Sequence, residues 1–100
     1  MVKGMRMFNK DGVFTIVPEG KLDGDVAKHL EGCLLSEEVR GSEAVVIDLK
    51  DISVVTADGI RVFLNAHIDS QTSGRKLQLT NPNSAVSELL QTVGLTELIA

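Results

Sequence analysis

The segment from Val45 to Ile60 constrains the fold of this chain more than any other part of the sequence. It opens with three consecutive β-branched residues, as a strand that is buried on both faces does. It closes with a small, polar, glycine-containing turn, after which a helical pattern begins. The segment therefore predicts a strand, a loop and the start of a helix. Open α/β folds usually place their binding surfaces at this end of a strand, and Asp58 is the residue there that we expect to matter most.

Size and composition predict one globular domain that spans residues 1–100. The chain has 100 residues, of which 43% are hydrophobic and 24% charged, enough to bury one core but not two. The net charge is −4 and the ten basic residues are scattered, which disfavours binding to nucleic acid. No apolar run approaches the roughly 20 residues that span a bilayer, so we expect no membrane insertion and a cytoplasmic location. The single cysteine, Cys33, fits a reducing compartment.

The residues before this segment predict a hairpin and a helix. Apolar-rich stretches at 2–8 and 13–17 flank Asp11-Gly12, a strong hairpin signal, and Pro18-Glu19-Gly20 is expected to end the second strand. Asp23 or Asp25 can cap the helix that follows. Its apolar stripe consists of Val26, Leu30, Cys33 and Leu34, with Gly41-Ser42 ending the segment ahead of a strand at 44–49.

The residues after the central turn predict two more helices and one more strand. The apolar stripe of the second helix consists of Ile60, Phe63, Leu64, His67 and Ile68, and this helix should end near Ser73-Gly74. A strand at 76–80 precedes Asn81-Pro82-Asn83-Ser84, which supplies the turn and cap of a third helix with Gly94 just past its end. Residues 95–99 should pack back as a short strand or helical turn. The three phenylalanines, Phe8, Phe14 and Phe63, are expected in the core.

The predicted fold class is α/β, with the element order β-β-α-β-α-β-α. We expect a mixed sheet of four to five strands with helices packed mainly on one face. No nucleophile–base pair, metal-ligand spacing or phosphate-loop motif occurs in the sequence, so we expect no enzyme activity, cofactor or metal. The two histidines, His29 and His67, are expected to be packed or at the rim of the core.

Two parts of the sequence follow the predicted hairpin at a characteristic separation. The first is the Asp48-Leu49 strand end with the Gly59-Ile60 helix start, and the second is the run Asn81-Pro82-Asn83-Ser84-Ala85-Val86 with Leu89-Leu90 and Val93-Gly94-Leu95. Together they resemble the STAS domain in its short bacterial anti-sigma factor antagonist form. The resemblance covers nearly the whole chain. It implies a cytoplasmic protein-interaction module of bacterial signalling and transcription regulation, which works by partner switching.

The same resemblance implies a partner and a regulatory site. Antagonists of this family bind an anti-sigma factor that is also a serine kinase, and phosphorylation of a serine at the start of the second helix switches them off. The family's turn reads Asp-Ser-Ser-Gly-Leu, whereas this chain has Thr56-Ala57-Asp58-Gly59-Ile60. The position of the phospho-acceptor is therefore Asp58, which has no hydroxyl for a serine kinase to modify.

Two interpretations of Asp58 stay open from the sequence: it can imitate a phosphoserine in part, or it can serve only the helix terminus. Phosphoryl transfer to Asp58 itself is disfavoured, because that chemistry generally needs a metal-binding acidic cluster and only Asp48 and Asp51 lie nearby in the sequence. Ser53 and Thr56 are the other hydroxyls of the segment that could receive a phosphate, but we expect neither to do so, and the Thr56 hydroxyl is well suited to cap the helix.

The predicted binding surface consists of Thr56, Ala57, Asp58, Gly59 and Arg61. Its expected partner is an anti-sigma factor, a serine kinase-like protein or an ATPase-type protein. An accessory STAS-like subunit of a transport ATPase or of a signalling complex is the alternative, and a small ligand-binding or enzymatic domain is less favoured.

Overall fold

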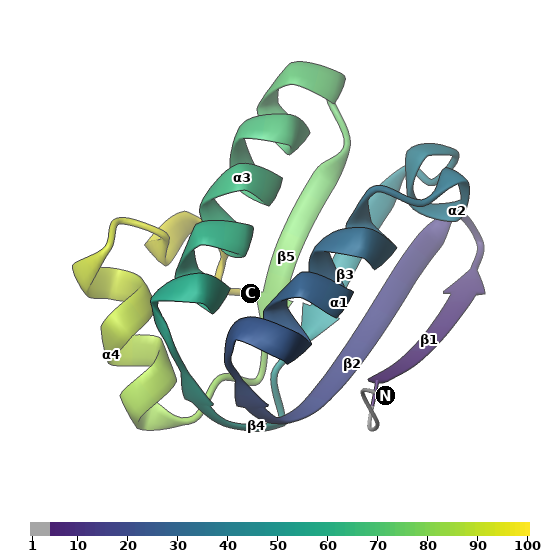
Figure 1. Cartoon of the computed structure of the whole chain (residues 1–100). Helices are drawn as coiled ribbons and strands as arrows, with labels where there is room; N and C mark the ends of the chain where they lie inside the picture. Colours follow the sequence, from purple (N-terminus) through teal and green to yellow (C-terminus); the bar gives the residue numbers. More distant parts are fainter. Residues whose placement is uncertain (1–4) are drawn as a thin grey trace.

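Strand β2 (Val13–Leu22) runs through the sheet and contacts three other strands. The computed structural model describes residues 5–100, and Figure 1 shows α1 and α3 lying side by side over one face of the sheet. The remaining strands are β1 (Met5–Lys10), β3 (Ala44–Asp48), β4 (Asp51–Val55) and β5 (Lys76–Thr80). The helices are α1 (Gly24–Leu34), α2 (Glu37–Arg40), α3 (Ala57–Ser73) and α4 (Ser84–Thr92), followed by a 3-10 turn, η1 (Thr96–Leu98).

The sheet is mixed and has five strands, which confirms the predicted fold class. Its order is β1-β2-β3-β5, with β1 antiparallel to β2 and the other pairs parallel, while β4 pairs with β2 alone. Asp11 and Gly12 form the predicted hairpin turn, with φ values of 52° and 83°. A two-residue hairpin turn with positive φ at both residues matches the twist of the two strands that it joins. The part of the predicted first strand that precedes Met5 lies outside the described residues.

The prediction that Pro18-Glu19-Gly20 ends the second strand is wrong, and so is the prediction that a loop follows residue 49. Strand β2 continues to Leu22, and its second half pairs with β4, which only two residues separate from the end of β3. Proline is tolerated because β2 changes partner there, from β3 at residues 13–16 to β4 at residues 19–22. The register shifts between Gly20 and Lys21, and Gly20 has a φ of 86° that a glycine adopts easily.

The sequence pattern also does not separate α2 from α1. The Ser36 hydroxyl donates to the Cys33 carbonyl at the end of α1 and accepts from the Val39 N–H at the start of α2. One serine therefore ends one helix and caps the next. The caps predicted at Asp23 and Asn83 are confirmed, because each side chain accepts a hydrogen bond from the backbone N–H three residues later.

The end of the chain packs back against the sheet, as predicted. Gly94 has a φ of 83° just past α4, and Ile99 forms an isolated parallel bridge with Leu79 after the turn η1. Residues 95–99 therefore contain both a helical turn and a strand-like contact.

The core lies between the sheet and the helices. Two predictions about apolar residues are wrong. Phe14 and Phe63 are buried, but Phe8 is 54% exposed, because it pairs with Thr15 and faces the side of the sheet opposite α1 and α3. Helix α3 buries Gly59, Val62 and Phe63, so the predicted stripe is rotated and its members Leu64 and Ile68 are exposed. Cys33 is half-buried against the core rather than within it.

Candidate functional site

Helix α3 begins where β2 and β4 both end, and the hydrogen bonds of Thr56 fix this junction. The backbone N–H and the hydroxyl of Thr56 both donate to the Leu22 carbonyl, each at 3.1 Å. Thr56 occupies the N-cap position of α3, but its side chain makes no capping hydrogen bond. The prediction that the Thr56 hydroxyl caps the helix is therefore wrong, because the end of β2 lies close enough to take that hydroxyl as a donor.

Gly59 is needed at this junction because a side chain there would have no room. A β-carbon at Gly59 would lie 2.8 Å from Val55 Cγ1 and 2.9 Å from the Leu22 carbonyl oxygen. These distances are too short for real contacts, so the first turn of α3 approaches β2 as closely as a glycine allows. Gly59 is buried, and the prediction that it belongs to the binding surface is corrected to a supporting position beneath that surface.

Asp58 lies in the first turn of α3 with an exposed carboxylate. Its Oδ1 accepts a hydrogen bond from Arg61 Nη2 at 3.1 Å, and the two side chains are 51% and 63% exposed, respectively. A β-carbon at Gly24, the first residue of α1, would lie 3.3 Å from Asp58 Oδ2. The carboxylate is therefore placed between the starts of two helices, where backbone N–H groups and helix dipoles favour negative charge by about 0.3–1 kcal/mol each.

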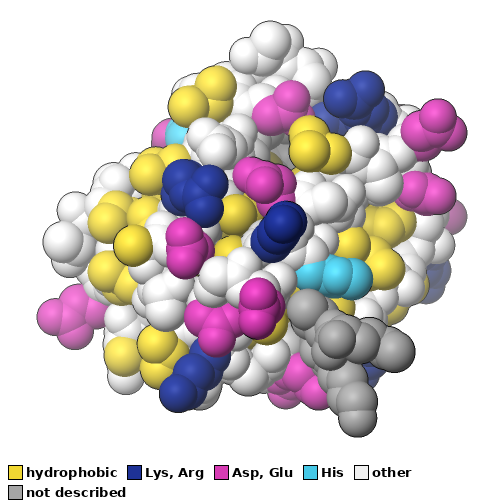
Figure 2. All heavy atoms as spheres, viewed as in Figure 1, with side chains coloured by type: hydrophobic (Ala, Val, Ile, Leu, Met, Phe, Trp, Pro, Cys, Tyr) yellow, Lys and Arg dark blue, Asp and Glu magenta, His cyan; other side chains and the backbone are white. Residues whose placement is uncertain are grey.

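We call the exposed and half-exposed part of this junction, made of Thr56, Ala57, Asp58 and Arg61, the helix-start surface. Ala57, Asp58 and Arg61 are exposed, and Thr56 is half-buried. Figure 2 shows that the face formed by α1 and α3 carries charged side chains of both signs with hydrophobic side chains between them. Such a surface suits a protein partner, because mixed charges give specificity and the apolar groups between them can be buried.

The other polar residues proposed for chemistry at this end are engaged in structural contacts. The Ser53 hydroxyl donates to the Gly20 carbonyl at 3.1 Å, and Asp51 forms an ion pair with Arg6 at 3.0 Å. Asp48 Oδ1 accepts from the Lys50 N–H and from Asn81 Nδ2. Within residues 5–100 no group of three or more histidine, cysteine or acidic residues could hold a metal ion. These contacts do not assemble the acidic metal site that phosphoryl transfer to Asp58 would need.

The run Asn81-Pro82-Asn83-Ser84 serves the fold beside the site rather than the surface itself. Asn83 caps α4 by accepting from the Val86 N–H at 2.8 Å, and its amide donates to the carbonyls of Ile52 and Ser53 in β4. One side chain therefore joins α4 to the strand that delivers the helix-start surface. The sequence indicated the cap at Asn83, but nothing in it pointed to the contacts with β4, because β4 itself was not predicted.

Both histidines and the cysteine lie away from this site. His67 is mostly buried and its Nε2 lies 2.9 Å from Glu97 Oε1, while its Nδ1 is buried without a partner among the described residues. His29 is exposed on α1. Burial raises the pKa of the Cys33 thiol, which lowers the fraction of reactive thiolate at a given pH. Along residues 5–100, every helix is too short or too polar to cross a membrane.

A family model described as the STAS domain matches residues 5–100. Among solved structures, SpoIIAA of Bacillus, an anti-sigma factor antagonist in its unphosphorylated form, has a TM-score of 0.84 at 15% identity, covering 97% of this chain and 86% of that one. A serine-to-glutamate variant of RsbS from Moorella thermoacetica has a TM-score of 0.76 at 24% identity, covering 91% and 78%.

A sulfate transporter family protein from Wolinella succinogenes also shares the fold, with a TM-score of 0.76 at 18% identity and coverage of 90% and 77%. No curated protein matches the chain by sequence. The structural similarities confirm the fold, and the family model covers all the described residues. The chain belongs to the STAS domain family.

Proposed function

We propose that this protein is a regulatory protein-interaction module of the anti-sigma factor antagonist type, which binds its partner through the helix-start surface and is not switched by serine phosphorylation at position 58. The single observation that carries the proposal is the exposed Asp58 carboxylate at the start of α3, paired with Arg61. It occupies the position at which related proteins carry a phosphorylatable serine.

The contacts of Asp58 favour a module fixed in one state. A phosphoserine brings a charge of about −1.5 to −2 and three acceptor oxygens, whereas Asp58 has one charge on a shorter side chain. One of its two oxygens is already bonded to Arg61, so the pair adds little net charge to the surface. The helix-start surface therefore resembles the unphosphorylated state of a related antagonist more than the phosphorylated state.

The partner that this surface fits is a soluble or peripheral protein of the kinase or ATPase type. The family supports a protein partner, and the mixed charges of Asp58 and Arg61 support contacts with both signs of charge on it.

The proposal that phosphorylation does not switch this protein is tested by incubating the purified protein with ATP and a candidate kinase, followed by intact-mass analysis. We expect no added phosphate, and stoichiometric modification at Ser53 or Thr56 would contradict the proposal.

A second candidate function is an accessory role on a transporter or signalling complex. The similarity to a sulfate transporter family protein favours it, because that protein carries the same fold at a TM-score of 0.76. The helix-start surface would then dock onto the transporter's cytoplasmic part. Capture experiments separate the two functions by the class of protein that is lost when Asp58 is replaced by lysine.

A further inference from the structure

We infer that the cavity between α1 and α3 is a binding site for a small apolar amine, a ligand with one ring or a short branched chain and a protonated ammonium group. The cavity has a volume of about 240 Å³ and lies over β3 and β5. This volume is below the roughly 300–1,000 Å³ of typical ligand pockets, so the ligand is smaller than the drug-sized molecules that fill them.

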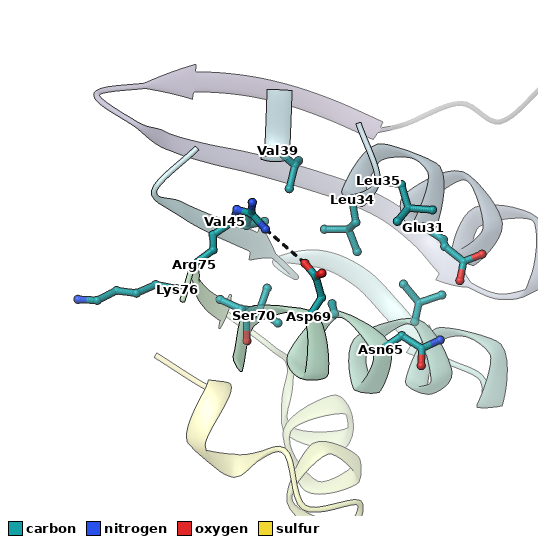
Figure 3. A pocket seen from close by; sticks show the side chains of 13 residues that line it. Glu31, Leu34, Leu35, Val39, Val45, Asn65, Asp69, Ser70, Arg75 and Lys76 are labelled. Atoms are coloured by element: carbon teal, nitrogen blue, oxygen red, sulfur yellow. Dashed lines mark hydrogen bonds and ion pairs between the residues drawn. The ribbon is translucent and has the colours of Figure 1, made fainter. Parts of the chain in front are cut away.

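The walls of the cavity are apolar. Leu34 at the end of α1, Leu35 just past it and Val39 from α2 line it from one side, as Figure 3 shows, and α3 closes the other side. The remaining apolar lining residues are Val45, Val62, Ala66 and Leu77. A hydrocarbon body bound here would lose its contact with water, which favours binding in proportion to the apolar area buried.

The positive groups near the cavity are not free to bind an anion. The Arg75 guanidinium is 13% exposed and donates through Nε to the Ser42 carbonyl, through Nη2 to the Arg40 carbonyl and through Nη1 to Asp69. It therefore holds the segment between α2 and β3 in place. Figure 3 shows the Lys76 side chain extending away from the cavity.

One carboxylate at the rim is unpaired among the described residues. Glu31 is a half-buried residue whose carboxylate has no hydrogen bond or ion pair with any of them, whereas Asp69 is paired through Oδ2 with Arg75 at 3.3 Å and keeps only Oδ1 free. The amide of Asn65 lies on the same rim and can accept one further hydrogen bond. An unpaired carboxylate beside an apolar cavity favours a ligand that combines a cation with an apolar body.

The cavity is separate from the helix-start surface. Asp58 and Asp69 both belong to α3, and the rise of an α-helix places them about 16 Å apart along its axis. A ligand in the cavity would contact the end of α1 and residues 62–70 of α3, whereas the helix-start surface consists of residues 56–58 and Arg61 at the start of α3. The ligand site can therefore be tested without disturbing the proposed partner surface.

Titration of the full chain with phenethylamine, followed by calorimetry and by amide chemical shifts, tests the inference. Phenylacetate and 2-phenylethanol are the matched probes, because they keep the ring and change the charge. We expect saturable binding of the amine that is about tenfold tighter than that of either control, as a charge-assisted hydrogen bond requires. Shifts should be centred on residues 31–35 and 62–70.

Two variants complete the test. Glu31→Gln should weaken binding of the amine about tenfold, whereas Glu88→Gln on α4, which does not line the cavity, should leave it unchanged. Ala66→Leu should fill the cavity and abolish binding while circular dichroism reports a folded protein. Absence of saturable binding, equal binding of phenylacetate, or an unchanged affinity in Glu31→Gln would overturn the inference.

Discussion

Asp58 and Arg61 form an ion pair within the first turns of α3, with Oδ1 and Nη2 3.1 Å apart. The pair lies beside the start of α1, because a β-carbon at Gly24 would be 3.3 Å from the other carboxylate oxygen. In the proposed function, this ion pair is a permanent and partly neutralised charge at the position where relatives carry a reversible one. The ion pair with Arg61 and the position beside α1 both affect how the protein would bind a partner, and both can be tested by substitution.

Asp58→Ser should bind the module's partner with an affinity within about threefold of the wild type, because we propose that the paired Asp58 represents the unphosphorylated state. The measurement is a calorimetric titration against the partner identified by capture. Arg61→Ala is the companion variant, since it frees the charge of Asp58 and should weaken binding. A tenfold or larger gain in affinity for Asp58→Ser would instead mean that Asp58 imitates a phosphate.

Gly59→Ala should destabilise the protein by about 1–3 kcal/mol, because the new methyl group would overlap the Leu22 carbonyl and the Val55 side chain. The measurement is the midpoint of urea denaturation. Gly32→Ala is a matched control in the interior of α1, where a β-carbon would meet nothing within 4 Å, and it should stabilise the protein by about 0.5–1 kcal/mol. If both variants changed the stability equally, the close approach of α3 to β2 at Gly59 would be contradicted.

Asn83→Ala should cost about 1–2 kcal/mol of stability, because it removes the cap of α4 and two hydrogen bonds to carbonyls of β4. Asn83→Asp separates these contributions, since the carboxylate can still cap the helix but cannot donate to β4. We expect the aspartate variant to recover part of the loss in thermal denaturation. Ser84→Ala, at the next and exposed position, should change the melting temperature little.

Cys33 should react with iodoacetamide more slowly than a free thiol at every pH below its raised pKa. Burial raises the pKa of this thiol above its ordinary value of 9.0, so less thiolate is present at a given pH. The measurement is the alkylation rate as a function of pH, followed by mass spectrometry. A rate profile with its midpoint at or below 9.0 would contradict the described burial of the side chain.

The sequence predicted the elements whose signals are local. The Asp11-Gly12 hairpin, the caps at Asp23 and Asn83, and the end of α4 at Gly94 depend on residues within one turn of each other, and all four are confirmed. The predicted strands and helices also occur in the predicted order, with α2 and β4 as unpredicted additions. Local hydrogen bonding and backbone preference decide these features, so tertiary contacts did not override them.

The wrong predictions concern features that are determined by contacts between residues far apart in the sequence. Strand β4 is identified only by its pairing with β2, and Pro18 concealed the continuation of β2 that makes this pairing possible. Phe8 is exposed because no element described here covers its face of the sheet, which the residue type cannot reveal. At the site, the start of α3 was predicted, but the hydrogen bond of the Thr56 hydroxyl to Leu22 depends on where β2 ends in space.

Quantitative capture from a bacterial lysate with the purified full chain as bait tests the central claim most directly. The comparison is between the wild type, the charge reversal Asp58→Lys, and Glu88→Lys as a reversal on α4, with circular dichroism confirming that each bait is folded. We expect a kinase- or ATPase-type protein to be retained by the wild type and by Glu88→Lys but lost with Asp58→Lys. Retention of the same proteins by all three baits would contradict it.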